Sequence, residues 1–177
     1  PSKIIIGNNS TDDNDIDSFY PTFSTDGEQA NLLRSTLKEL GYVEKGDEID
    51  NGGDISVGIR KAGQNVFKTI KQELPKVSLR VTSGNDSYHQ GIKKYTSRHK
   101  TGRGLDFTIS PSTKSNLDKV VNILQRYAAG NNPNFRFIDE YRHLTSKGTG
   151  NHFHISWGPG TEAQANLNKS LLLAEEG

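Results

Sequence analysis

The chain has 177 residues, which suffices for one domain with its own hydrophobic core and is short for two. Its formal net charge of +1 gives no electrostatic case for a nucleic-acid partner, and no apolar run approaches the length that spans a bilayer. The absence of Cys excludes disulfides, thiolate metal sites and a cysteine nucleophile. Any metal must therefore be held by His, Asp or Glu.

The first predicted elements are two amphipathic helices, preceded by a polar segment. Residues 1–26 are rich in Asn, Asp, Ser and Thr with interspersed aromatic residues, and we expect an amino-terminal arm there. Apolar residues recur on one helical face over residues 27–40 and again over 59–74. Gly41 ends the first of these helices and Pro75 ends the second.

Strands and one further helix follow these two helices. Strict alternation predicts a strand over residues 77–83, and a polar loop then leads to a short strand over 105–109. A capping-box pattern of Ser115 and Asp118 predicts a third helix over about 116–129.

The carboxyl-terminal part adds strands over residues 135–141 and 152–157, and Thr161 with Gln164 predicts a last helix. This order of elements predicts an α+β domain whose helices flank a small, mainly antiparallel sheet.

Two of the five histidines lie one residue apart on a predicted strand. Period-two alternation puts His152 and His154 on one face of the sheet, with Phe153 and Ile155 on the other. Taken alone, this pattern is equally typical of a polar sheet face without any metal.

A second cluster lies in the segment SRHKTGRGLD, residues 97–106. It places His99 in a loop and Asp106 at the start of a strand. An ionised carboxylate between apolar neighbours is costly unless it is paired or bound to metal, so an ion pair with Arg98 or Arg103 is the alternative. His99, Asp106 and His154 together would supply the three protein ligands typical of a catalytic zinc site.

The pattern S-x-H-x-x-G-x-x-x-D at Ser97 to Asp106, followed by His-x-His at His152 to His154, resembles a known family. It is similar to the zinc D-Ala-D-Ala carboxypeptidases and phage L-Ala-D-Glu endolysins, whose fold is shared by hedgehog amino-terminal domains. The similarity covers residues 77–157. It implies that His99, Asp106 and His154 bind Zn²⁺, and that His152 stabilises the tetrahedral intermediate.

The sequence departs from the family at the general base. Many relatives carry an acidic residue three positions before the last zinc His, where this chain has Asn151. A strand over residues 135–141 paired with the His-x-His strand would offer Glu140 instead, with Asp139 as the alternative because it shares parity with the apolar Phe135 and Phe137.

The family's substrate-carboxylate Arg, which follows the Ser-Gly turn, is also absent, because residues 85–90 read NDSYHQ. This absence favours an endopeptidase over a carboxypeptidase. His89 and His143 are as consistent with ordinary loop positions as with a role at the site.

The resemblance predicts a zinc peptidase acting on peptidoglycan peptides. We expect it to be part of a larger protein, because the chain contains no Met even at its first position. A phage lysin or a virion-associated protein, found in the virion or released to the bacterial cell wall, would fit; otherwise a secreted or periplasmic location is expected. Other domains or subunits of a virion assembly are the expected partners besides the substrate. The alternatives are a non-catalytic zinc-stabilised binding module and a structural virion domain without metal.

Overall fold

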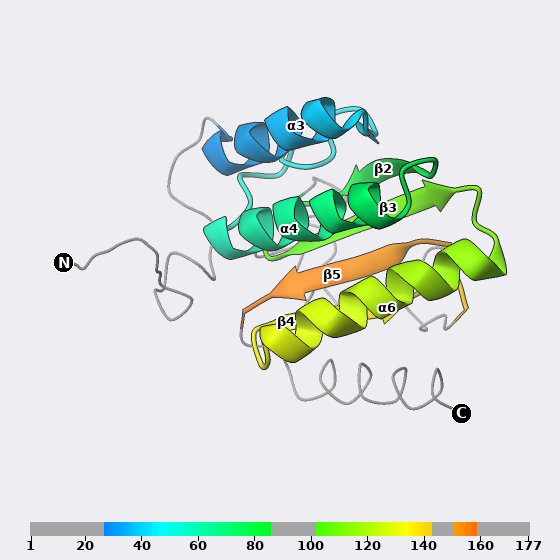
Figure 1. Cartoon of the computed structure of the whole chain (residues 1–177). Helices are drawn as coiled ribbons and strands as arrows, with labels where there is room; N and C mark the ends of the chain where they lie inside the picture. The colour runs from blue at the N-terminus through cyan, green and yellow to red at the C-terminus, as the bar shows by residue number, and fades with distance from the viewer. Residues whose placement is uncertain (1–26, 86–101, 143–150, 159–177) are drawn as a thin grey trace.

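The computed structural model describes residues 27–85, 102–142 and 151–158, and these form an α+β domain (Figure 1). The elements run in the order α3 (Glu28–Leu40), β1 (Val43–Glu44), α4 (Val57–Glu73), β2 (Ser78–Ser83), β3 (Gly104–Ser110), α6 (Lys114–Gly130), β4 (Phe135–Asp139) and β5 (Phe153–Trp157). The predicted amino-terminal arm and the predicted last helix lie outside the described residues. No described helix is long and apolar enough to cross a membrane.

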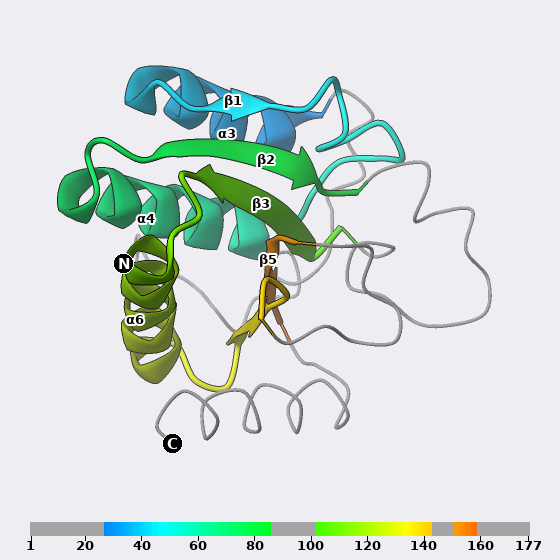
Figure 2. The same ribbon diagram turned by 90° about the vertical axis from the view of Figure 1, so that its right-hand side faces the viewer.

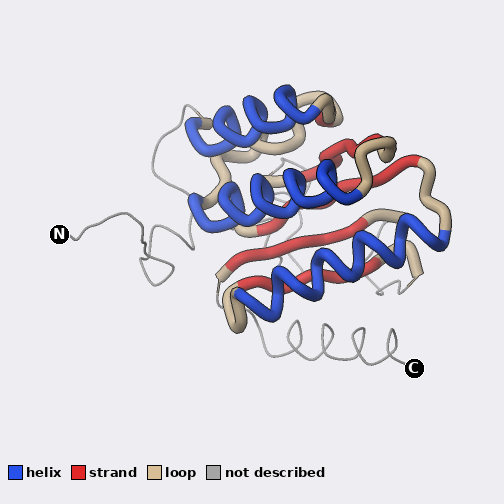
Figure 3. The backbone as a smooth tube through the Cα atoms, viewed as in Figure 1, coloured by secondary structure: helices blue, strands red, loops and turns tan. Residues whose placement is uncertain are grey.

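The strands form one five-stranded sheet in the order β1-β2-β3-β5-β4. Only the β1–β2 pair is parallel, so the mainly antiparallel sheet predicted from the sequence is confirmed. The three described helices cover one face of this sheet, as the tube in Figure 3 and the turned view in Figure 2 show. The opposite face is therefore free to carry polar groups.

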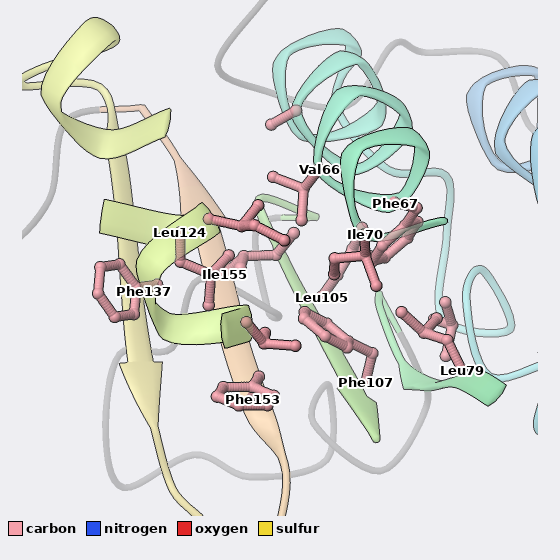
Figure 4. Packing of buried hydrophobic residues seen from close by; sticks show 14 of the residues in the cluster. Val66, Phe67, Ile70, Leu79, Leu105, Phe107, Leu124, Phe137, Phe153 and Ile155 are labelled. Atoms are coloured by element: carbon pink, nitrogen blue, oxygen red, sulfur yellow. The ribbon is translucent and has the colours of Figure 1, made fainter. Parts of the chain in front are cut away.

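The hydrophobic core lies between the helices and the sheet (Figure 4). Phe107 of β3 stacks on Phe153 of β5 at a centroid distance of 5.4 Å, and it meets Phe67 of α4 edge-on at 5.2 Å. Leu105 and Ile155 are fully buried beside them. Because alternate residues of a strand point to opposite faces, this packing directs Asp106 and His154 to the face away from the helices.

Three details of the elements differ from the prediction. The strand predicted over residues 135–141 ends at Asp139, so Glu140 and Tyr141 lie in the turn that follows it. The strand β1 is short, and its exposed Val43 gives no alternating pattern that would have predicted it. The cap of α6 is Thr113, whose hydroxyl accepts the backbone N–H of Asn116 at 3.2 Å, so the predicted capping role of Ser115 is wrong. The helix begins before Ser115, which lies inside its first turn.

A buried carboxylate from a distant loop caps α3. Asp54 accepts the backbone N–H groups of Gln29 and Ala30, each at 3.0 Å, and also that of Ile55 at 2.8 Å. The N–H groups of Gln29 and Ala30 lie in the first turn of α3, where they have no acceptor within the helix. The helix dipole also favours a negative charge at this end. This interaction joins α3 to the loop that precedes α4.

Replacing Asp54 by alanine should lower the free energy of unfolding by about 3 kcal/mol, because it leaves buried N–H donors without an acceptor. Chemical denaturation monitored by circular dichroism measures the change. Asp47→Ala removes an exposed carboxylate from the same loop region and should change stability by less than about 0.5 kcal/mol. Equal stability of the two variants would contradict the capping role of Asp54.

Candidate metal and catalytic site

The site is built on the antiparallel pairing of β3 with β5. In this register Asp106 lies directly opposite His154, and Phe107 lies opposite Phe153. Residues directly opposite each other on neighbouring strands project from the same face. The pairing therefore brings the Asp of one sequence motif to the His-x-His of the other, although they are far apart in the chain.

Asp106 contacts both histidines of the His-x-His segment. Its Oδ1 lies 2.9 Å from Nδ1 of His154, and its Oδ2 lies 3.5 Å from Nε2 of His152. All three side chains are buried, with Asp106 and His154 each 7% exposed. The sequence prediction that His152 and His154 share a face is confirmed by this common partner.

Glu140 completes the cluster from the end of β4. Strand β4 pairs with β5 in antiparallel register, and its last residue, Asp139, lies opposite Phe153. The next residue, Glu140, therefore comes beside His152. The Oε1 atom of Glu140 lies 3.3 Å from Nε2 of His152, and Glu140 is only 6% exposed. The structure thus brings together Asp106, His152, His154 and Glu140.

Asp139, the alternative base, is engaged elsewhere. Its Oδ2 accepts from Nε of Arg142 at 2.8 Å, and its Oδ1 accepts the backbone N–H of Tyr141 at 3.0 Å. Asn151, at the position where many zinc peptidases have their base, is exposed. Of the two candidate bases, Glu140 is therefore the one whose carboxylate contacts His152.

A bulge in β2 adjoins the site. From Val81 to Ser83 the strand advances two residues, while its partner β3 advances only one, from Phe107 to Asp106. Such bulges recur beside active sites, where they redirect a side chain or end the pairing. Here the bulge brings Ser83 opposite Asp106.

The turn before β3 depends on a glycine. Gly102 has a φ of 68°, in the left-handed region that a side chain disfavours, and its carbonyl accepts the N–H of Ser56 at 2.8 Å. This agrees with the tight turn expected between His99 and Asp106. Arg103, a possible ion-pair partner of Asp106 in the sequence analysis, is buried, with 8% of its surface exposed.

The third expected ligand, His99, lies outside the described residues, as do Ser97, Arg98, His89 and His143. Among residues 27–85, 102–142 and 151–158, no group of three His, Asp or Glu side chains is arranged to hold a metal ion. Asp106 and His154 are the two expected ligands that lie within the described residues.

These two residues fit a zinc ion in donor type, and they lie side by side. Imidazole nitrogen and carboxylate oxygen are both common zinc ligands, at about 2.0 to 2.2 Å from the metal. At a tetrahedral angle two such donors lie roughly 3.3 Å apart, so a bound ion would replace the 2.9 Å hydrogen bond between His154 Nδ1 and Asp106 Oδ1. A divalent cation would also compensate the negative charges of Asp106 and Glu140 in this buried setting.

Sequence reasoning did not single out Tyr141 and Arg142, which follow Glu140 in the chain. The hydroxyl of Tyr141 accepts the backbone N–H of Ile109 at 3.0 Å, and Arg142 pairs with Asp139. An Arg three residues after an Asp at a strand end is a local signal for such a turn, although a weak one.

No protein-family model matches the chain, and no curated protein matches its sequence at a significant level. Membership of the zinc-peptidase family therefore stays a prediction from the two motifs.

Proposed function

We propose that this chain is a zinc-dependent peptidase that hydrolyses peptide bonds of bacterial peptidoglycan, as an endopeptidase within a phage lysin or virion-associated protein. The observation that carries the proposal is the contact of Asp106 with both His154 and His152, with Glu140 beside His152. Two carboxylates and two imidazoles converge there on the sheet face away from the helices. The proposed ligands are His99, Asp106 and His154.

A bound zinc ion would supply a water whose pKa is about 7 and would polarise the scissile carbonyl group. In the proposed reaction Glu140 takes a proton from the attacking water and passes it to the nitrogen of the leaving amine. His152 donates a hydrogen bond from Nε2 to the carbonyl oxygen as negative charge develops on it. Glu140 and His152 are 3.3 Å apart, so the carboxylate also orients this imidazole.

A non-catalytic zinc module, in the manner of hedgehog domains, is the second candidate. It is favoured by Asn151, which stands where a base is often found and which cannot take a proton from water. The location of Glu140 favours the enzyme, because a buried carboxylate 3.3 Å from His152 is placed to exchange a proton with a reacting group beside that imidazole. We therefore favour the enzyme.

Digestion of purified murein by the full chain tests the proposal. We expect products that carry one new amino and one new carboxyl group within stem peptides or cross-links, identified by mass spectrometry. A chelator should abolish their formation and added zinc should restore it, whereas added magnesium should not. Release of a single terminal amino acid would instead identify a carboxypeptidase.

Three results of this digestion would contradict the proposal. Intact murein together with one bound zinc per chain would indicate the non-catalytic zinc module. Intact murein with neither zinc in the purified protein nor rebinding at neutral pH would indicate the structural virion domain. Hydrolysis that persists in the chelator would remove the metal from the mechanism.

A further inference from the structure

The turn that follows β4 is tied to the rest of the domain by three consecutive residues. The first tie is made by Asp139, which is 1% exposed and whose carboxylate binds Nε of Arg142 at 2.8 Å. Arg142 then reaches α6, where its Nη1 lies 2.5 Å from Oδ1 of Asp118. One guanidinium group therefore joins the end of β4 to the helix that covers the sheet.

The second tie is made by Tyr141. Strand β5 begins at Phe153 and its pairing with β3 ends at Phe107, so it does not reach Ile109. The hydroxyl of Tyr141 accepts the N–H of Ile109 instead, and its ring lies 5.1 Å from that of Phe153. Burial raises the pKa of Tyr141, and the hydrogen bond from Ile109 opposes that rise. The phenol therefore stays neutral at physiological pH.

The third tie is made by Glu140, which lies between the other two. Its backbone N–H donates to the carbonyl of His152 at 2.9 Å, and its carboxylate lies 3.3 Å from the ring of the same residue. Both contacts depend on the path of residues 139–142. A shift of this turn would move the Glu140 carboxylate relative to His152.

We propose that Arg142 is a positioning residue that holds Glu140 against His152 by tying the buried carboxylate of Asp139 to α6. Without Arg142, the buried carboxylate of Asp139 loses its pairing cation and keeps only the N–H of Tyr141. A buried charge that loses its ion-pair partner is strongly unfavourable. The turn then rearranges to expose Asp139 to water. The effect of Arg142 on catalysis rests on the proposed function, in which Glu140 is the base. Its effect on the position of Glu140 does not depend on that function.

A double-mutant cycle with Glu140 tests the positioning role. Arg142→Ala should lower the turnover number on murein on the order of tenfold to a hundredfold, with KM and bound zinc unchanged. The same substitution in a Glu140→Gln background should produce no further loss, because the group it positions is already inactive. Arg142→Lys keeps a cation near Asp139 and should recover part of the rate.

Amide hydrogen exchange in the metal-free protein provides a readout that does not depend on activity. The N–H of Glu140 should exchange at least about tenfold faster in Arg142→Ala, while core amides of β3 stay protected. Asp118→Asn removes only the charge of the α6 carboxylate that binds Arg142. It should change the turnover number and the exchange rate of the Glu140 amide in the same directions as Arg142→Ala, but by less. Arg126→Ala, which breaks an exposed pair between α6 and Glu73, is the matched control and should change neither.

Equal loss of turnover from Arg142→Ala in both backgrounds would overturn the proposal, because Arg142 would then act independently of Glu140. Unchanged exchange at Glu140 would overturn it as well. A wild-type chain that binds zinc but leaves murein intact would contradict the proposed function alone, and the exchange measurement would still decide whether Arg142 holds the turn.

Discussion

Replacing Asp106 by asparagine is expected to remove zinc binding and, with it, hydrolysis. The substitution preserves the shape of the side chain but removes the charge of the oxygen that faces Nδ1 of His154 at 2.9 Å. Loss of the metal withdraws several kcal/mol of charge stabilisation from the transition state, so we expect the rate to fall on the order of 10³-fold or more. Metal analysis after dialysis and the rate of murein hydrolysis measure the two effects.

The control for this substitution is Asp47→Asn, which makes the same chemical change at an exposed loop position. It should retain the zinc content and the rate of the wild type. If Asp106→Asn also retained both, Asp106 would be only a hydrogen-bond partner of the two histidines. The proposed ligand set would then be wrong.

Replacing Glu140 by glutamine is expected to abolish turnover while zinc stays bound. The amide keeps the size of the side chain and can still contact His152, but it cannot take a proton. Loss of a general base typically lowers rates by about 10² to 10⁴-fold. The expected signature is therefore a large fall in the turnover number with unchanged zinc stoichiometry, which distinguishes this variant from Asp106→Asn.

Glu39→Gln, at an exposed position of α3, provides the matched control and should behave as the wild type. A Glu140→Gln variant with full activity would rule out Glu140 as the base. Asp139 would be a poor replacement, because its oxygens already bind Arg142 and the N–H of Tyr141.

Much of the fold could be predicted from periodicity. Leu79 and Val81 of β2 are buried, as is Val77 just before it, and these residues alternate with polar ones as the sequence pattern predicts. The same rule of alternation predicted that His152 and His154 share a face, and both contact Asp106. These predictions succeed because one face of each strand is fixed by burial against the helices. The choice of Glu140 over Asp139 as the base rests on the same rule and stays a prediction.

Other features depend on contacts that no local pattern encodes. The pairing of Val43 with Arg80 makes β1 a strand, but two residues are too few to show alternation. The capping of α3 by Asp54 joins residues 25 positions apart in the chain. Likewise, the tie from Asp139 through Arg142 to Asp118 requires the end of β4 and the helix α6 to be neighbours in space.

The central claim is that one zinc ion is held by His99, Asp106 and His154. A crystal of the full chain grown with zinc, with diffraction recorded on both sides of the zinc absorption edge, tests it most directly. We expect one anomalous peak at about 2.0 to 2.2 Å from a nitrogen of each histidine and an oxygen of Asp106. No peak at Asp106 and His154, or a peak there without His99 as a ligand, would contradict the claim.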